Sequence, residues 1–412
     1  MQAETLPLRR NRDFLLLWIG AGVSLLGLRT SVVAYPLLML WYGDSPIGAG
    51  MVGFAVLLPQ LLVQLPAGAL VDRWDRRRLL IGCDIAGMLV MGAVVMMLAS
   101  GRLWLPALMG AAFVDGAAGL TYRLAERAAI SHVVPSSQLP RALGQNEARG
   151  QAAGLLGQPA GSGFFTLGHW VPFGFTAVSH LIALVTLLFI RKDLQGERTA
   201  PTRNVRSEVA EGVQWVWRQR FMRAAVGLIS GSNLLFQVLV LTLALIVKEH
   251  GGSALTVGLI GLVAGLGGVV GALAGAWAVD RVRLFTVLAG SLGAWTALMV
   301  PVAFTSDPWL LGLLLAGMSF AGALMNVVAG VRQVRVTPNA LQGRVTSVFA
   351  LLGSGLGSAG ALVGGLLLSA FGTCATALAV AAAMGLLALT AVVAPALRDD
   401  AVEARGPGCQ AI

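Results

Sequence analysis

Apolar segments long enough to cross a lipid bilayer recur along the whole chain, and no other feature restricts its fold as strongly. A membrane-spanning helix needs about 20 mostly apolar residues, and repeated segments of this length are typical of a polytopic membrane protein. The composition agrees, because only 12% of the residues are charged, whereas a soluble domain carries about 25%. The sequence therefore predicts an all-α polytopic membrane protein.

We predict twelve transmembrane helices from these segments. The first segment is too long for the core of a signal peptide, and no small-residue cleavage site follows it. The predicted spans are residues 14–41, 47–71, 79–100, 103–122, 143–168, 172–190, 222–247, 254–279, 284–305, 309–331, 345–371 and 373–397.

The two halves of the chain resemble each other in sequence. Gly50, Gly53 and Val71-Asp72-Arg73 recur at a nearly constant spacing as Gly258, Gly261 and Val279-Asp280-Arg281. A duplicated six-helix unit explains this order, so we expect two pseudo-symmetric bundles of six helices. The predicted domains are 1–190 and 222–398, joined by a cytoplasmic linker over 191–221 and followed by a cytoplasmic tail over 399–412.

Arginine and lysine predict the orientation, because they are concentrated in cytoplasmic loops. With the N-terminus inside, all 29 lie in inner segments except Arg29 in the first span and Arg102 and Lys248 in outer links. Both termini are therefore expected in the cytoplasm, with the spans in the cell membrane. The linker is expected to be solvated, or to form an amphipathic helix on the inner membrane surface over 207–219.

A short charged link joins the second and third spans, with the pattern Gly68-x-x-x-Asp72-Arg73-x-x-Arg76-Arg77. An unpaired charge in hydrocarbon costs about 3 kcal/mol or more, so this link lies in water or among headgroups. The simplest interpretation is a turn whose arginines anchor the inner side. The pattern is also similar to the signature between helices 2 and 3 of the major facilitator superfamily of secondary transporters, which implies the fold of that superfamily.

The same resemblance implies a latch that closes the inner gate. In it Asp72 would face the N-terminus of the eleventh helix, Gly68 would let helices approach closely, and Arg76 would bridge to Glu126. The second copy of the signature keeps only part of the pattern. The candidate gating residues are Gly68, Asp72, Arg73, Arg76, Arg77, Glu126, Asp280 and Arg281.

The N-terminal half is more closely similar to the branch that contains the enterobactin exporter and macrolide efflux proteins. Five segments carry this resemblance: Arg12-Asp13-Phe14, Leu25-Leu26-Gly27, Pro36-Leu37-Leu38, the run from Pro66 to Arg78, and Val134-Pro135. Two departures matter for coupling. Leu28 stands where the branch usually has an acidic residue, and Gln158 displaces by one place the proline of an element that resembles the helix-5 motif of antiporters.

Charged side chains deep in a membrane span are candidates for function, because burying them is costly. Arg29 lies about 22 Å from the inner end of the first span, and Asp115 about 18 Å from the outer end of the fourth. We expect the two to pair across the cavity, with Asp115 coupling protons. The alternatives are a structural ion pair or an arginine that snorkels to the membrane surface. Asp84 is expected at the inner surface. Candidate substrate-cavity residues, which are equally able to join helices, are Gln60, Gln64, Asn233, Gln237 and Asn326.

The sequence favours a transporter and not an enzyme. No nucleophile–base spacing or P-loop is present, and no cofactor, metal site or nucleic-acid partner is expected. The first hypothesis is a monomeric exporter of a small, partly hydrophobic molecule, such as a drug, antibiotic or siderophore-like metabolite, by alternating access and proton antiport. One alternative is an importer of a nutrient with the same fold. Another is a membrane sensor or assembly protein that does not transport.

Overall fold

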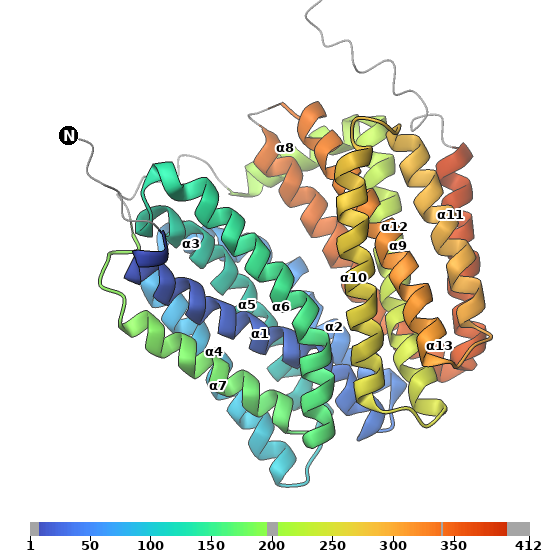
Figure 1. Ribbon diagram of the computed structural model, residues 1–412, viewed down its shortest axis with the longest axis horizontal. Helices are drawn as coiled ribbons and strands as arrows, with labels where there is room; N and C mark the ends of the chain where they lie inside the picture. Colours follow the sequence, from blue (N-terminus) through green and yellow to red (C-terminus); the bar gives the residue numbers. More distant parts are fainter. Residues whose placement is uncertain (1–7, 196–204, 339–340, 394–412) are drawn as a thin grey trace, which may run out of the picture. The chain divides into compact units, whose positions relative to one another are not determined.

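The computed structural model describes residues 8–195, 205–338 and 341–393. The predicted tail over 399–412 and residues 196–204 of the predicted linker lie outside this part. Helices make up almost all of what is described (Figure 1). The long helices are α1 (Arg12–Trp41), α2 (Pro46–Leu62), α3 (Gln64–Arg73), α4 (Arg76–Ala99), α5 (Leu105–Val133), α6 (Leu139–Leu167), α7 (Val171–Leu188), α8 (Val205–Arg218), α9 (Arg220–Glu249), α10 (Ala254–Ala278), α11 (Leu284–Val302), α12 (Pro308–Val336) and α13 (Gln342–Val393).

The prediction of an all-α polytopic fold is confirmed. Among the described residues, eight helices are long and apolar enough to cross a membrane, and the bent pair α2–α3 can be counted as a ninth. α13 joins two helices across a break at Gly372, where the backbone has φ 73°. Counting α13 as two, and adding α5 and α6, which carry more charges, accounts for each of the twelve predicted spans.

Two breaks in the helices have identifiable causes. The helical path bends by 51° between α2 and α3, and Pro66 lies just after the break. A proline ring clashes with the carbonyl four residues earlier and removes one helical hydrogen bond, which bends the chain there. The left-handed backbone of Gly372 is readily adopted only by glycine, and it divides α13 where the eleventh and twelfth spans were predicted to meet.

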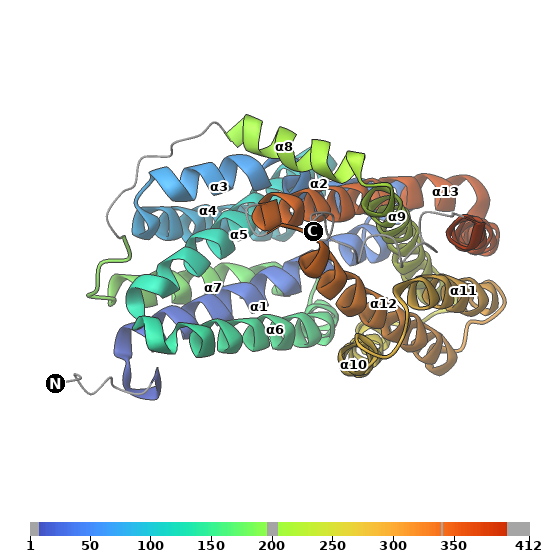
Figure 2. The ribbon, with the colours of Figure 1, turned by 90° about the horizontal axis from the view of Figure 1, so that it is seen from above.

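The structure forms two compact units, residues 1–205 with 251–259, and residues 206–250 with 260–412. In the first unit α1 packs against α2, α5, α6 and α7, and α4 packs against α5 and α7. Figure 2 shows α1, α6 and α7 running side by side. The side chain of Asn11 caps the start of α1 by accepting from the backbone N–H of Phe14, and its amide donates to the carbonyl of Val133 at the end of α5.

In the second unit glycines hold helices close together. A Cβ atom added to Gly267 or Gly271 of α10 would lie 2.3 or 2.2 Å from a backbone oxygen of α12, and one added to Gly360 of α13 would lie 2.3 Å from the oxygen of Leu234 in α9. Small residues allow such approaches between membrane helices. These glycines therefore serve helix packing inside one unit.

Part of the predicted linker is helical. α8 turns into α9 at Gln219 (Figure 2), so residues 207–218 are helical, and their place on the inner membrane surface stays a prediction. Val216 is fully buried against Met222, Val226 and neighbouring residues of α13. Trp217, the next residue, is exposed, because α8 contacts its unit through the side that carries Val216.

Candidate functional site

A buried cluster of ionisable side chains joins four helices of the first unit. Asp84 of α4, Asp115 of α5 and His180 of α7 are at most 3% exposed. Nδ1 of His180 donates to Oδ1 of Asp84 at 3.0 Å, and its Nε2 lies 3.7 Å from Oδ1 of Asp115. From α1, the hydroxyl of Ser24 donates to Asp84 at 3.2 Å and that of Ser31 to Asp115 at 2.8 Å. One imidazole therefore lies between two carboxylates.

The cluster retains capacity for a proton. Nε2 of His180, Oδ1 of Asp115 and Oδ2 of Asp84 are buried and have no hydrogen-bond partner among the residues that the structure describes. A buried charge without compensation is strongly unfavourable, and a protonated His180 can balance only one of the two carboxylates. A proton bound by either carboxylate would remove this uncompensated charge.

Two expectations about these residues are wrong. Asp84 was expected at the inner surface, but it is fully buried because its side of α4 faces α7. Asp115 was expected to pair with Arg29, yet it accepts from Ser31 and approaches His180. Arg29 precedes Ser31 by two residues, which turns it by about 200° around α1 and away from Asp115.

Gly87 of α4 makes room for the imidazole of His180. A Cβ atom at this position would lie 2.5 Å from Nε2 and 2.7 Å from Cδ2 and Cε1 of that ring. We expect Gly87→Ala to displace the ring and to lower stability by about 1–3 kcal/mol, measured as loss of thermal stability in detergent. Gly92→Ala, in the same helix, is the control, because no described atom lies within 4 Å of its added Cβ. Equal stability of the two variants would show that Gly87 does not confine the imidazole.

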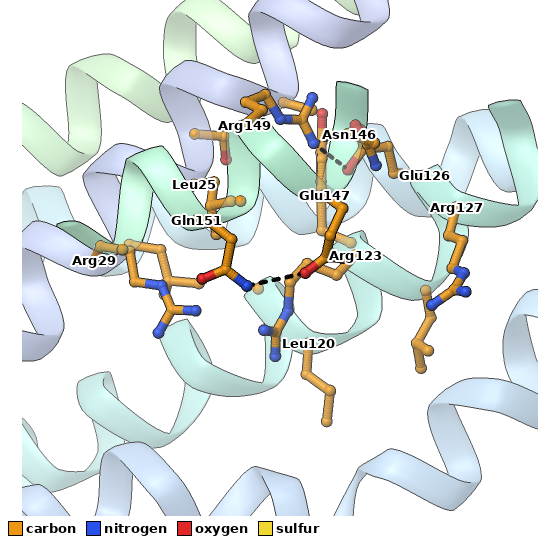
Figure 3. Close-up of a pocket in the computed structure, with 18 of the residues that line it drawn as sticks. Leu25, Arg29, Leu120, Arg123, Glu126, Arg127, Asn146, Glu147, Arg149 and Gln151 are labelled. Carbon is orange, nitrogen blue, oxygen red and sulfur yellow. Dashed lines mark hydrogen bonds and ion pairs between the residues drawn. The ribbon is translucent and has the colours of Figure 1, made fainter. Parts of the chain in front are cut away.

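A cavity of about 660 Å³ opens beside this cluster within the first unit. Residues of α1, α5 and α6 line it, and His180 and Ser24 of the cluster form part of its wall. Four arginines and two glutamates also line it: Arg29, Arg123, Arg127, Arg149, Glu126 and Glu147. In Figure 3 the guanidinium groups of Arg29 and Arg123 point to the same side of the cavity, and Arg127 lies further along α5.

A buried ion pair closes one side of the cavity (Figure 3). Nη2 of Arg149 donates to both carboxylate oxygens of Glu126, at 2.7 and 3.0 Å, and Nη1 donates to the carbonyl of Trp18 at 2.7 Å. The side chains of Arg149 and Glu126 are only 9% and 4% exposed. The pair ties α6 to α5 and α1, so Glu126 has a partner other than the expected Arg76.

The arginines of the charged link bind helix ends. Nη1 of Arg76 lies 3.0 Å from Nδ1 of His132 and donates to the carbonyls of Ala128 and Leu194 at 3.4 Å. Nη2 of Arg77 donates to the carbonyls of Leu187 and Leu188 at the end of α7. Cations are favourable at helix C-termini, which explains why Arg76 contacts the end of α5 and not Glu126 one turn or more inside it.

Asp72 and Arg73 of the link are exposed, and Gly68 and Asp75 are half-buried. Asp72 and Arg73 make no hydrogen bond or ion pair within the described part of their own unit, and no described atom lies within 4 Å of a Cβ added to Gly68. No helix of its own unit therefore approaches Gly68 closely, and the close approach expected there stays a prediction. Asp75, which was not singled out, caps α4 by accepting from the backbone N–H of Arg78.

In the second unit the partial copy of the signature makes different contacts. Asp280 pairs with Arg335 of α12 at 2.8 Å, and both side chains are more than half exposed. Arg281 donates to the carbonyl of Trp277 at 3.0 Å and lies over its ring. A surface ion pair of this kind contributes about 1 kcal/mol or less.

The five uncharged polar candidates do not line the cavity of the first unit. Gln60 and Gln64 lie in α2 and α3 and are half-buried. In the second unit Asn233 donates to the carbonyl of Gly353 at 3.1 Å, Gln237 lies beside Gly360, and Asn326 is exposed. Their role in binding a substrate stays a prediction.

Membrane-length helices in two units, with a charged cavity and buried carboxylates inside one unit, define a polytopic membrane protein. A model described as Major Facilitator Superfamily matches residues 17–361 and 237–408. Multidrug efflux pump Tap of Mycobacterium tuberculosis is 30% identical over 389 residues, 90% of each chain. Tap of Mycolicibacterium fortuitum is 28% identical over 411 residues, 94% of this chain and 95% of that one.

The fold agrees with this relationship. The solved structure of the nucleoside transporter NupG matches with a TM-score of 0.75 at 13% identity, covering 94% of this chain and 99% of that one. The chain belongs to the major facilitator superfamily. It is a multi-pass protein of the cell membrane.

Proposed function

We propose that this chain exports a small, partly hydrophobic molecule across the cell membrane by alternating access, in exchange for protons. Relatives named multidrug efflux pumps, similar over about nine-tenths of the chain, favour export. The observation that carries the coupling is His180, which belongs to the buried carboxylate cluster and also lines the cavity. A substrate in the cavity and a proton in the cluster thus act on one side chain.

The proton step follows from charge balance. When His180 and one carboxylate are charged, the second carboxylate is a buried charge without compensation, and a proton on Asp115 removes that cost. A ligand that binds one protonation state better shifts the equilibrium between conformations, which is what coupling requires. Leu28 stands where the branch with the enterobactin exporter usually has an acidic residue, and it packs against Gly119. In this proposal the cluster of Asp84, Asp115 and His180 binds the coupling proton instead.

Everted membrane vesicles test the direction of transport with a panel of fluorescein, rhodamine 123 and ethidium. We expect vesicles that contain the protein to accumulate at least one dye when energised, and to release it when a protonophore is added. Accumulation only in right-side-out vesicles would instead make the chain an importer. If the protein moves no dye in either orientation, export of partly apolar molecules is contradicted, and a sensor or assembly role is favoured.

We further propose that Asp72 acts in the gate on the cytoplasmic side, where both termini also lie. Asp72→Asn is expected to reduce dye export by tenfold or more, because a lost charge contact of about 1.4 kcal/mol corresponds to tenfold. Abundance should stay near normal, since Asp72 is exposed. Asp75→Asn is the matched control, because asparagine caps a helix about as well as aspartate. Unchanged export by Asp72→Asn would remove this residue from the gate.

A further inference from the structure

We infer that the cavity between α1, α5 and α6 is a subsite for an anionic group, so that the preferred substrates are amphipathic anions such as aromatic carboxylates. This inference rests on the proposed function in taking the cavity as part of the transport path. Arg29, Arg123 and Arg127 would bind the anionic group, and they lie on two helices of the first unit.

The three guanidinium groups have no partner of their own. Arg149, the fourth arginine of the cavity, is neutralised by Glu126. Glu147 accepts from Gln151 at 3.0 Å. By contrast, Arg29, Arg123 and Arg127 form no hydrogen bond or ion pair within residues 8–195, 205–338 and 341–393, although they open on a shared cavity (Figure 3).

Placing like charges together is unfavourable unless an opposite charge joins them. The positive charges of Arg29 and Arg123 repel each other. The α1 backbone at Arg29 packs closely on α6, because a Cβ added to Gly157 would lie 2.4 Å from the Cβ of Arg29. An anion between the two guanidinium groups would relieve their repulsion and accept charge-assisted hydrogen bonds from both.

The rest of the wall suits an apolar body. Five leucines line the cavity beside the arginines: Leu25, Leu28, Leu120, Leu124 and Leu143. A volume of about 660 Å³ lies in the range of sites that hold a drug-sized ligand. A flat aromatic or aliphatic body with one carboxylate, sulfonate or phosphate group fits both parts of this wall. An anionic lipid headgroup shares that chemistry, so the test includes a lipid arm.

Equilibrium dialysis of the purified full chain tests the inference with 2-naphthoate and its neutral analogue 2-naphthamide. In nanodiscs of phosphatidylcholine we expect naphthoate to bind about tenfold or more tightly than naphthamide, because hydrogen bonds to a charged group contribute about 1.5–3 kcal/mol. Arg29→Gln and Arg123→Gln should each remove most of that preference and leave naphthamide binding unchanged. Arg29→Lys, which keeps the charge, should retain part of it.

Arg102→Gln is the matched control, because Arg102 is equally cationic and exposed but lies in the link between α4 and α5, outside the cavity. Equal binding of acid and amide by the wild type would overturn the inference. So would an equal loss in Arg102→Gln and Arg29→Gln, which would indicate a general attraction of anions. Phosphatidylglycerol, retained in native mass spectra by the wild type and lost in Arg29→Gln, with no naphthoate preference, would identify a lipid site instead.

The binding measurement uses no gradient, so it fails or succeeds independently of export. Selective naphthoate binding together with no dye export would leave the anion subsite standing and contradict the proposed export. Dye export without any preference for naphthoate would support the proposed export and contradict the anion subsite. Each outcome therefore decides one proposal without the other.

Discussion

Asp115→Asn is expected to abolish proton-driven export while the exchange of substrate across the membrane continues in the absence of a gradient. Asparagine keeps the shape of aspartate and can still accept from Ser31, but it cannot bind and release a proton. The conformational change would then lose its link to the proton gradient. Counterflow of a labelled dye in proteoliposomes measures the exchange, and accumulation in energised everted vesicles measures the driven export.

Two further variants accompany this prediction: His180→Gln as a second test and Asp307→Asn as the control. The first removes the ring that lies between Asp84 and Asp115, so it should also uncouple transport. The second changes an exposed carboxylate that caps α12, and it should transport normally. Simultaneous loss of exchange and driven export in Asp115→Asn would make the cluster a structural ion network. Driven export at the wild-type level would exclude Asp115 as the coupling residue.

Arg149→Met should be the most destabilising single change considered for the first unit. It leaves the carboxylate of Glu126 buried without its cation, and breaking a buried ion pair costs about 3–5 kcal/mol. It also removes the hydrogen bond to the carbonyl of Trp18. We expect a loss of Tm on the order of 10 °C, measured by fluorescence-detected size exclusion after heating in detergent.

A double variant separates the ion pair from the packing of its side chains. Replacing both partners with apolar residues of similar volume is often nearly neutral, so Arg149→Met with Glu126→Leu should recover most of the lost stability. Arg191→Met is the control, because Arg191 is exposed beyond the end of α7. Equal instability of the single and double variants would contradict the account, since volume alone would then explain the loss.

The sequence predicts the fold well because hydrophobic length alone determines where membrane helices lie. The spans, their order and the break at Gly372 follow from it. Helix ends are less predictable. α5 continues to Val133, well past the charged residues from Arg123 onward that were taken as its end, because those residues face a cavity and not lipid. The bend between α2 and α3 depends on Pro66, which the hydropathy of the span conceals.

The site is only partly predictable, because contacts depend on which helix faces meet. Asp115 is identifiable from its depth alone. Its partner is not, since His180 lies far along the chain in another span. A histidine within an apolar span is itself a costly buried group, and that signal points to His180. The position of Arg29 relative to Asp115 depends on rotation around α1, which charge and depth do not specify.

Export in exchange for protons is the central claim, and the most direct test records both fluxes at once. Proteoliposomes loaded with the pH-sensitive dye pyranine receive whichever panel dye the everted vesicles accumulate, with no gradient imposed. The account predicts that movement of that dye drives protons in the opposite direction, and that Asp115→Asn moves the dye with no proton flux. Dye movement without any proton movement in the wild type, or with protons in the same direction, would contradict it.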